Sequence, residues 1–243
     1  MKIRFQTFWL PKRGNSEEEY EDAAFPMESG ESESDEFLCA VADGATEASF
    51  SRRWAQLLVQ GFADRTELAE LAQKWSDEIL TMELPWYAQE KAESGAFATL
   101  SGLILNGTTG TYSSKLLGDS CIFHIRDDKL VESFPMTNYE SFNSSPALLC
   151  SRLSQHEDLE SIFSYKEGEW ISGDRFILLT DAIAAWIFKL QESKGDGIKT
   201  LIAIKDQVQL AELCADARAT HDEEGRPNMR NDDVTLLDVH VYA

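Results

Sequence analysis

The run EFLCAVADG, residues 36–44, sets the fold class that this sequence predicts. Six apolar residues in a row are closed by Asp43 and Gly44. A short continuous apolar run that ends in turn-forming residues is typical of a strand buried on both faces. We therefore expect a buried strand here, with the carboxylate of Asp43 at its end.

Strand-like and helical patterns continue on both sides of this run. Alternating or apolar segments predict strands at residues 2–10, 96–105, 109–117, 120–126, 129–134, 162–165, 175–180 and 234–241. Helical spacing begins at Glu47 and predicts helices at residues 47–62, 67–80, 182–189 and 205–221, with a weaker one from Pro85. The acidic segment 28–35 is predicted to be a solvated loop. Strands follow strands and helices come in pairs, which favours an α+β fold of antiparallel sheets with helices packed outside.

Composition and charge exclude several classes of function. The chain has 43 acidic and 22 basic side chains, a formal net charge of −21. Nucleic acids and anionic membranes are bound by clustered Lys and Arg, so neither is an expected partner. Apolar segments are much shorter than the ~20 residues of a membrane span, and the N-terminus does not resemble a signal peptide. Four separated cysteines without a CxxC pair predict a reduced, cytoplasmic protein. With no linker or repeat, one domain over residues 1–243 is expected.

The informative residues are five aspartates at the ends of apolar strands. Carboxylates gathered at one edge of a sheet repel one another strongly unless a positive charge neutralises them. Few basic residues accompany these positions, so a divalent metal is the expected counter-charge, and oxygen ligands favour Mg²⁺, Mn²⁺ or Ca²⁺ over zinc. The five acids are Asp22, Asp43, Asp119, Asp181 and Asp232.

An alternative interpretation applies to each of these acids taken singly. An aspartate at a strand end is more commonly a turn former or a helix cap than a metal ligand. The order and spacing of all five along the chain therefore carry the metal hypothesis.

That order resembles the metal-dependent protein phosphatases (PPM, the type 2C serine/threonine phosphatases), in a divergent bacterial-type form. The resemblance runs from about Gly14 to Val239. It rests on six short motifs: Glu21-Asp22-Ala23, the hydrophobic strand ending in Asp43-Gly44, Gly95 with Thr99, Gly118-Asp119-Ser120, the strand of residues 173–181 ending in Asp181, and Asn231-Asp232-Asp233-Val234-Thr235.

The resemblance implies a four-layer αββα sandwich of two antiparallel sheets flanked by helix pairs. It also implies two Mg²⁺ or Mn²⁺ ions at one end of the sandwich. In that family pattern Asp43 bridges both ions, Asp22 holds a water on the metal, and these two residues are the catalytic ones. The remaining implied ligands are the carbonyl of Gly44, the carboxylates of Asp181 and Asp232, and Asp119 in a third, weaker position.

The activity implied by the resemblance is hydrolysis of phosphoserine and phosphothreonine in proteins. Water activated between two divalent ions attacks phosphorus, so no cysteine nucleophile is required. A phosphorylated protein would be the substrate in a signalling role, and a cognate Ser/Thr kinase is a further expected partner.

Several residues depart from the family pattern. Glu17 stands where the family commonly has an arginine that grips phosphate, so the expected substitutes are Lys12, Arg13, Arg52 or Arg53. The acid four residues after Asp181 is replaced by Ala185. These departures motivate an alternative, a non-catalytic phosphatase-like module that binds a phosphoprotein or a kinase. A third interpretation is a purely structural acidic domain that binds no Mn²⁺ stoichiometrically.

Overall fold

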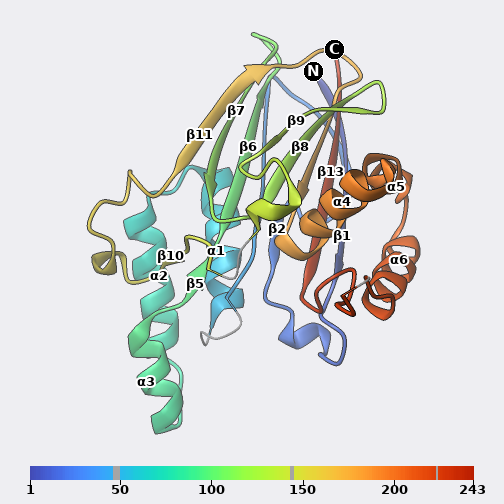
Figure 1. Cartoon of the computed structure of the whole chain (residues 1–243). Coiled ribbons are helices and arrows are strands. Elements are labelled where there is room, and N and C mark those ends of the chain that lie inside the picture. The colour runs from blue at the N-terminus through green and yellow to red at the C-terminus, as the bar shows by residue number, and fades with distance from the viewer. Residues whose placement is uncertain (46–49, 143–144, 223) are drawn as a thin grey trace.

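Two antiparallel sheets stack face to face in the computed structural model, which describes residues 1–45, 50–142, 145–222 and 224–243 (Figure 1). The first sheet has the strand order β3 (Gly30–Glu33), β1 (Lys2–Leu10), β13 (Val234–Tyr242), β12 (Arg175–Leu179), β8 (Cys121–Arg126), β9 (Lys129–Phe134). The second has the order β11 (Ser164–Glu169), β7 (Thr111–Leu117), β6 (Leu100–Asn106), β4 (Glu36–Ala42), β2 (Ala23–Phe25). A short pair, β5 (Phe97–Ala98) with β10 (Leu149–Cys150), lies beside them.

Helices cover the outer faces of both sheets, and short 3₁₀ turns complete the connections. Figure 1 shows α1 to α3 on one side of the sandwich and α4 to α6 on the other. The helices are α1 (Ser51–Asp64), α2 (Leu68–Leu80), α3 (Trp86–Ser94), α4 (Asp181–Lys194), α5 (Gly197–Ala203) and α6 (Gln207–Ala219). The 3₁₀ turns are η1 (Glu17–Glu19), η2 (Tyr139–Ser141) and η3 (Leu153–Gln155).

Three apolar cores separate these four layers. The inner core lies between the sheets and is built from alternate residues of the central strands, such as Phe176 and Leu178 of β12. The opposite face of β12, with Ile177 and Leu179, packs against α4 to α6. The third core lies between the second sheet and α1 with α2. The α+β class and the sandwich of two sheets flanked by helices are therefore confirmed.

Burial on both faces explains why the sequence of strand β4 does not alternate between polar and apolar residues. Phe37, Cys39 and Val41 point into the inner core, and Ala40 and Ala42 pack under α1. From Phe37 onward both faces pack against other layers, so every position is apolar until the strand ends beside Asp43.

The structure differs from the sequence-based expectations in some elements. Residues 30–33 form strand β3 where a solvated loop was expected, because the backbone pairs with β1 while Glu31 and Glu33 reach Arg4 and Lys2 on the exposed face. Helix α5 was not predicted. The start of the first predicted helix, residues 47–49, lies outside the described residues.

Two further features concern the cysteines and the helices. Each of the four cysteines is buried and carries a free thiol. Over the described part of the chain, none of the helices has the length and apolar character needed to cross a bilayer.

Candidate metal centre

Three of the predicted carboxylates meet at one end of the sandwich. Asp43 follows β4, Asp119 lies in the turn between β7 and β8, and Asp181 is the first residue of α4 after β12. One ligand atom from each lies within 4.8 Å of the others. Because β4 and β12 belong to different sheets, the cluster forms only when the two sheets stack.

The most buried carboxylate of the cluster indicates that the site suits a divalent cation. Asp119 is 2% exposed, and neither of its carboxylate oxygens has a hydrogen-bond partner among the described residues. Burying a carboxylate removes its hydration, and without hydrogen-bond donors or a cation that loss of free energy is not compensated. Oxygen ligands alone, in a group of three, suit Mg²⁺ or Mn²⁺.

Electrostatic repulsion within the cluster leads to the same interpretation. Burial raises the pKa of Asp43 well above its ordinary range, and neighbouring aspartates raise it further: Asp22, Asp181, Asp232 and Asp119. Burial, and then the charge of Asp181, raises the pKa of Asp119 to about 7, against the opposing charge of Arg230. The carboxylates therefore need cations to remain ionised together at neutral pH.

Thr99 fixes the position of Asp43. The amide of Asp43 donates to Thr99 Oγ1 at 2.9 Å, and the amide of Thr99 donates to the carbonyl of Asp43 at 2.9 Å. The same hydroxyl shares a hydrogen bond of 2.8 Å with Ser120, the residue after Asp119. Thr99 and Ser120 therefore hold the backbone segments of Asp43 and Asp119 in position through hydrogen bonds.

Gly44 and Gly118 are required by close packing. A Cβ on Gly44 would lie 2.6 Å from the carbonyl oxygen of Glu21, which brings the Asp22 segment next to Asp43. Gly118 has a φ of 93°, and a Cβ there would lie 2.5 Å from Thr99 Cγ2. The carbonyl of Gly44 as a metal ligand stays a prediction.

Asp22 lies beside the three acids and is held by two hydroxyls. Its Oδ2 accepts hydrogen bonds from Thr180 Oγ1 at 2.9 Å and from Thr235 Oγ1 at 2.7 Å. Burial raises the pKa of Asp22 well above its usual value, against these hydrogen bonds. Thr180 is the N-cap residue of α4 but makes no side-chain cap: its hydroxyl donates to Asp22 and accepts the amide of Thr235 at 2.9 Å. Asp22 is not one of the three residues whose ligand atoms converge.

Asp232 and Asp233, adjacent in sequence, act in different ways: Asp232 through its charge and Asp233 through hydrogen bonds. Asp232 is also outside the converging three, although its charge raises the pKa values of Asp43 and Asp181. Asp233 accepts the amide of Lys12 at 2.7 Å on one oxygen and the amide of Glu21 at 2.7 Å on the other. It therefore fastens the segment that leads to Asp22.

One residue of this site was missed by the sequence analysis. Arg230 donates from Nη2 to Asp181 Oδ2, so a guanidinium contacts the cluster. It stands two positions before Asp232, and that proximity in sequence was the signal available. The sequence analysis expected few basic residues beside the acids, and Arg230 is one that contacts them.

Two of the basic residues expected to reach phosphate are engaged elsewhere. Arg52 donates to the backbone carbonyls of Glu17 and Glu18. Arg53 forms a two-pronged ion pair with Glu78. Glu17 itself is exposed in η1.

Of the comparisons with known proteins, the one with solved structures identifies the fold. No family model matches the sequence, and no curated protein does either. Solved structures match over nearly the whole chain. The photosystem II phosphatase PBCP has 17% identity and a TM-score of 0.66, covering 99% of both chains. The Mycobacterium tuberculosis serine/threonine phosphatase PstP/Ppp has 16% identity and a TM-score of 0.62, covering 100% of both.

A third structure is the catalytic domain of PstP in complex with two manganese ions. It has 16% identity and a TM-score of 0.59, covering 99% of this chain and 100% of that one. This chain has the fold of the metal-dependent protein phosphatases. The resemblance found in the sequence motifs is confirmed at the level of the fold, and the chain is a divergent example of this PPM architecture.

Proposed function

We propose that the protein is a metal-dependent phosphatase that hydrolyses phosphoserine and phosphothreonine in proteins. The observation that carries this proposal is the convergence of Asp43, Asp119 and Asp181, with both Asp119 oxygens buried and without donors. The phosphatase fold and the two manganese ions of the PstP catalytic domain support it. The proposed partners are a phosphorylated protein and the Ser/Thr kinase that modifies it.

The three converging carboxylates would hold Mg²⁺ or Mn²⁺, with Asp232 and the Gly44 carbonyl as further ligands. Divalent ions there would lower the pKa of water toward neutrality and neutralise the charge of a phosphate monoester. Thr99 keeps Asp43 in place through both its amide and its hydroxyl.

Asp22 is the second proposed catalytic group. Two hydroxyls occupy its Oδ2 and fix the orientation of the carboxyl. The other oxygen, Oδ1, is proposed to orient the attacking water and to take up its proton. A positioned aspartate carboxylate is a suitable general base for such a proton transfer.

A second candidate is the non-catalytic module that binds a phosphoprotein or a kinase. It is favoured by Ala185, which lies buried one turn after Asp181 where the family pattern has an acid. It is also favoured by the exposed Glu17 in place of the phosphate-binding arginine. Under this hypothesis a phosphopeptide binds without turnover.

The test is hydrolysis of p-nitrophenyl phosphate and of a phosphothreonine peptide, with Mn²⁺ and with a chelator. We expect turnover that needs Mn²⁺ and falls at least about a hundredfold in Asp43→Asn, since a ligand of the ions is lost. Asp127→Asn, at an exposed position in the β8–β9 turn, is the matched control and should keep full activity. Turnover unaffected by Asp43→Asn would overturn the proposal, and phosphopeptide binding without turnover would favour the second candidate.

A further inference from the structure

We propose that Arg230 binds the phosphoryl group of the substrate, exchanging Asp181 for phosphate oxygens when cations occupy the carboxylate cluster. This inference rests on the proposed function and assigns a substrate-binding role to a residue outside the motifs of the sequence resemblance.

The side chain of Arg230 spans from the cluster to solvent. Its Nη2 donates to Asp181 Oδ2, yet 49% of the Arg230 side chain is exposed, against 10% for Asp181. Its positive charge also acts on Asp119. A side chain that contacts the cluster through Nη2 and is about half exposed lies where an incoming anion can reach it.

The backbone on both sides of Arg230 is anchored. Met229 is 1% exposed, and its amide donates to the carbonyl of Ala217 in α6 at 3.2 Å. Asn231 Oδ1 accepts the amide of Arg13 at 2.7 Å, and Asn231 Nδ2 donates to the Arg13 carbonyl at 3.1 Å. The side chain of Arg230 can therefore change partners while its backbone stays in place.

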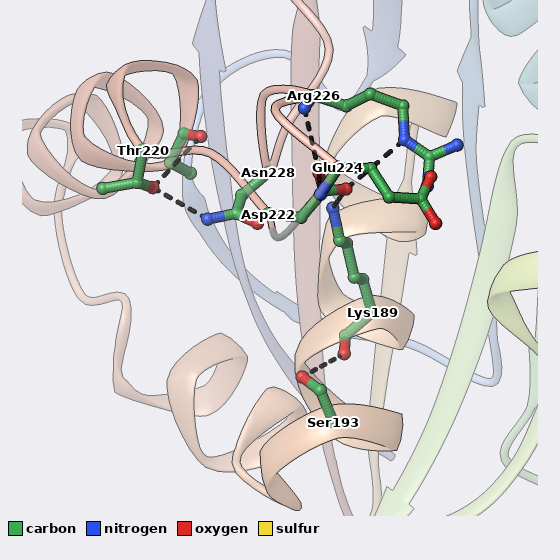
Figure 2. Close-up of polar contacts among 8 residues, drawn as sticks. Lys189, Ser193, Thr220, Asp222, Glu224, Arg226 and Asn228 are labelled. Carbon is green, nitrogen blue, oxygen red and sulfur yellow. Dashed lines mark hydrogen bonds and ion pairs between the residues drawn. The ribbon is translucent and has the colours of Figure 1, made fainter.

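The preceding part of this loop is tied to α4 and α6, as Figure 2 shows. Lys189 of α4 donates to Asp222 at 2.9 Å, and Asn228 Nδ2 donates to Thr220 Oγ1 at 3.0 Å. Arg226 pairs with Asp222 and Glu224 within the loop itself. Arg226 therefore offers a comparison arginine on the same loop whose partners lie outside the cluster.

The chemistry of the guanidinium suits this exchange. Carboxylate and phosphate oxygens fit the same planar donors, so Asp181 occupies donor sites that a phosphate could take. Cations that bind Asp181 compete with Arg230 for its carboxylate and free those donors. In a protein with a net charge of −21, a phosphate dianion needs positive charge close to the ions that it approaches.

Two of the four basic residues expected to reach phosphate are held by other partners. Arg52 is held by backbone carbonyls of η1, and Arg53 by Glu78. Position 17 carries an acid. Arg230 is, by contrast, in direct contact with a carboxylate of the cluster.

The experiment compares the wild-type protein with Arg230→Gln, Arg230→Lys and Arg226→Gln in Mn²⁺. Three quantities are measured on each: the affinity for inorganic phosphate by calorimetry, and kcat and KM for p-nitrophenyl phosphate. We expect Arg230→Gln to weaken phosphate binding and raise KM by about tenfold or more, the scale of a lost charge-assisted hydrogen bond. Arg230→Lys should be intermediate, and Arg226→Gln should match the wild type.

Manganese affinity separates this role from damage to the metal site. We expect Arg230→Gln to bind Mn²⁺ as tightly as the wild type or more tightly, because a competitor for Asp181 is gone. Phosphate affinity within twofold of the wild type in Arg230→Gln, or no phosphate binding by the wild type in Mn²⁺, overturns the inference. Phosphate binding that depends on Arg230 without any turnover would support the inference while contradicting the proposed hydrolysis.

Discussion

Thr99 and Asp43 are joined by a reciprocal pair of hydrogen bonds, each 2.9 Å long, in which each residue's backbone amide is the donor. Thr99 is 1% exposed, so its side of both bonds is shielded from water. Its hydroxyl also contacts Ser120, and one side chain therefore ties the segments of two cluster acids together.

Replacing Thr99 by valine tests this link. Valine has the same shape without the hydroxyl, so the Asp43 amide and the Ser120 hydroxyl lose a buried partner. We expect the free energy of unfolding to fall by about 1–3 kcal/mol and Mn²⁺ affinity to fall with it, measured by urea unfolding and calorimetry. Thr99→Ser keeps the hydroxyl and serves as the control. Unchanged Mn²⁺ affinity in Thr99→Val would contradict the positioning role.

Replacing Asp119 by asparagine should separate stability from metal binding. The change removes a buried negative charge beside Asp43 and Asp181, so in chelator at pH 8 we expect a Tm higher by about 2–4 °C. In the wild type, Mn²⁺ at a hundred times its Kd should add about 2.7 kcal/mol of stability, and much of this gain should be missing in Asp119→Asn. Thermal unfolding with and without Mn²⁺ measures both, and an equal gain in the two proteins would argue against Asp119 as a ligand.

Asp233 should control the order of the segment before Asp22. Asp233→Ala leaves the amides of Lys12 and Glu21 without their acceptor, and we expect hydrogen exchange in residues 12–21 to accelerate by about tenfold or more. Asp233→Asn has one oxygen in place of two and should give an intermediate rate. Exchange as slow as in the wild type for the alanine variant would show that other contacts hold this segment.

A buried ion pair outside the cluster should contribute to the stability of the fold in acid. Arg175 makes two hydrogen bonds of 2.5 Å to Asp238, which is 1% exposed. Burial opposes ionisation of Asp238, but hydrogen bonds from His240 and Arg175 outweigh it and lower its pKa. Because the folded pKa lies below the unfolded one, this carboxylate stabilises the fold above pH ~4 and loses that contribution as pH falls through the folded pKa.

The corresponding variant is Asp238→Asn. At pH 7 it should lose about 3 kcal/mol of unfolding free energy, since Arg175 is left buried without its counter-charge. The difference from the wild type should shrink as the pH is lowered below about 4. Urea unfolding between pH 7 and pH 3 measures it, and a constant difference over that range would contradict the assigned sign.

The sequence predicted those parts of the fold that burial on regular faces encodes. The run ending at Asp43 and the spacing of α1 are patterns of that kind. Strand β3 was not predicted, because its acidic composition is typical of loops. Its hydrogen bonds to β1 nevertheless hold it as an edge strand. Helix α5 escaped because its seven residues are too few to display a helical period.

The candidate site was predictable in its acids and less so in their neighbours. Asp43, Asp119 and Asp181 stand at strand ends, and the sheet order brings strand ends together. The contact between Arg230 and Asp181 depends on the path of a loop, which no periodic pattern specifies. The double acceptance by Asp233 likewise depends on where residues 12–21 pass, which only the folded chain determines.

The placement of Asp43 and Asp181 on different sheets has a mechanical consequence. The distances between their carboxylate oxygens depend on how the two sheets are aligned. Sliding one sheet against the other would therefore change these distances directly. Ions bound by the cluster would resist this sliding. A substitution that repacks the core between the sheets would change the affinity of the cluster for the ions.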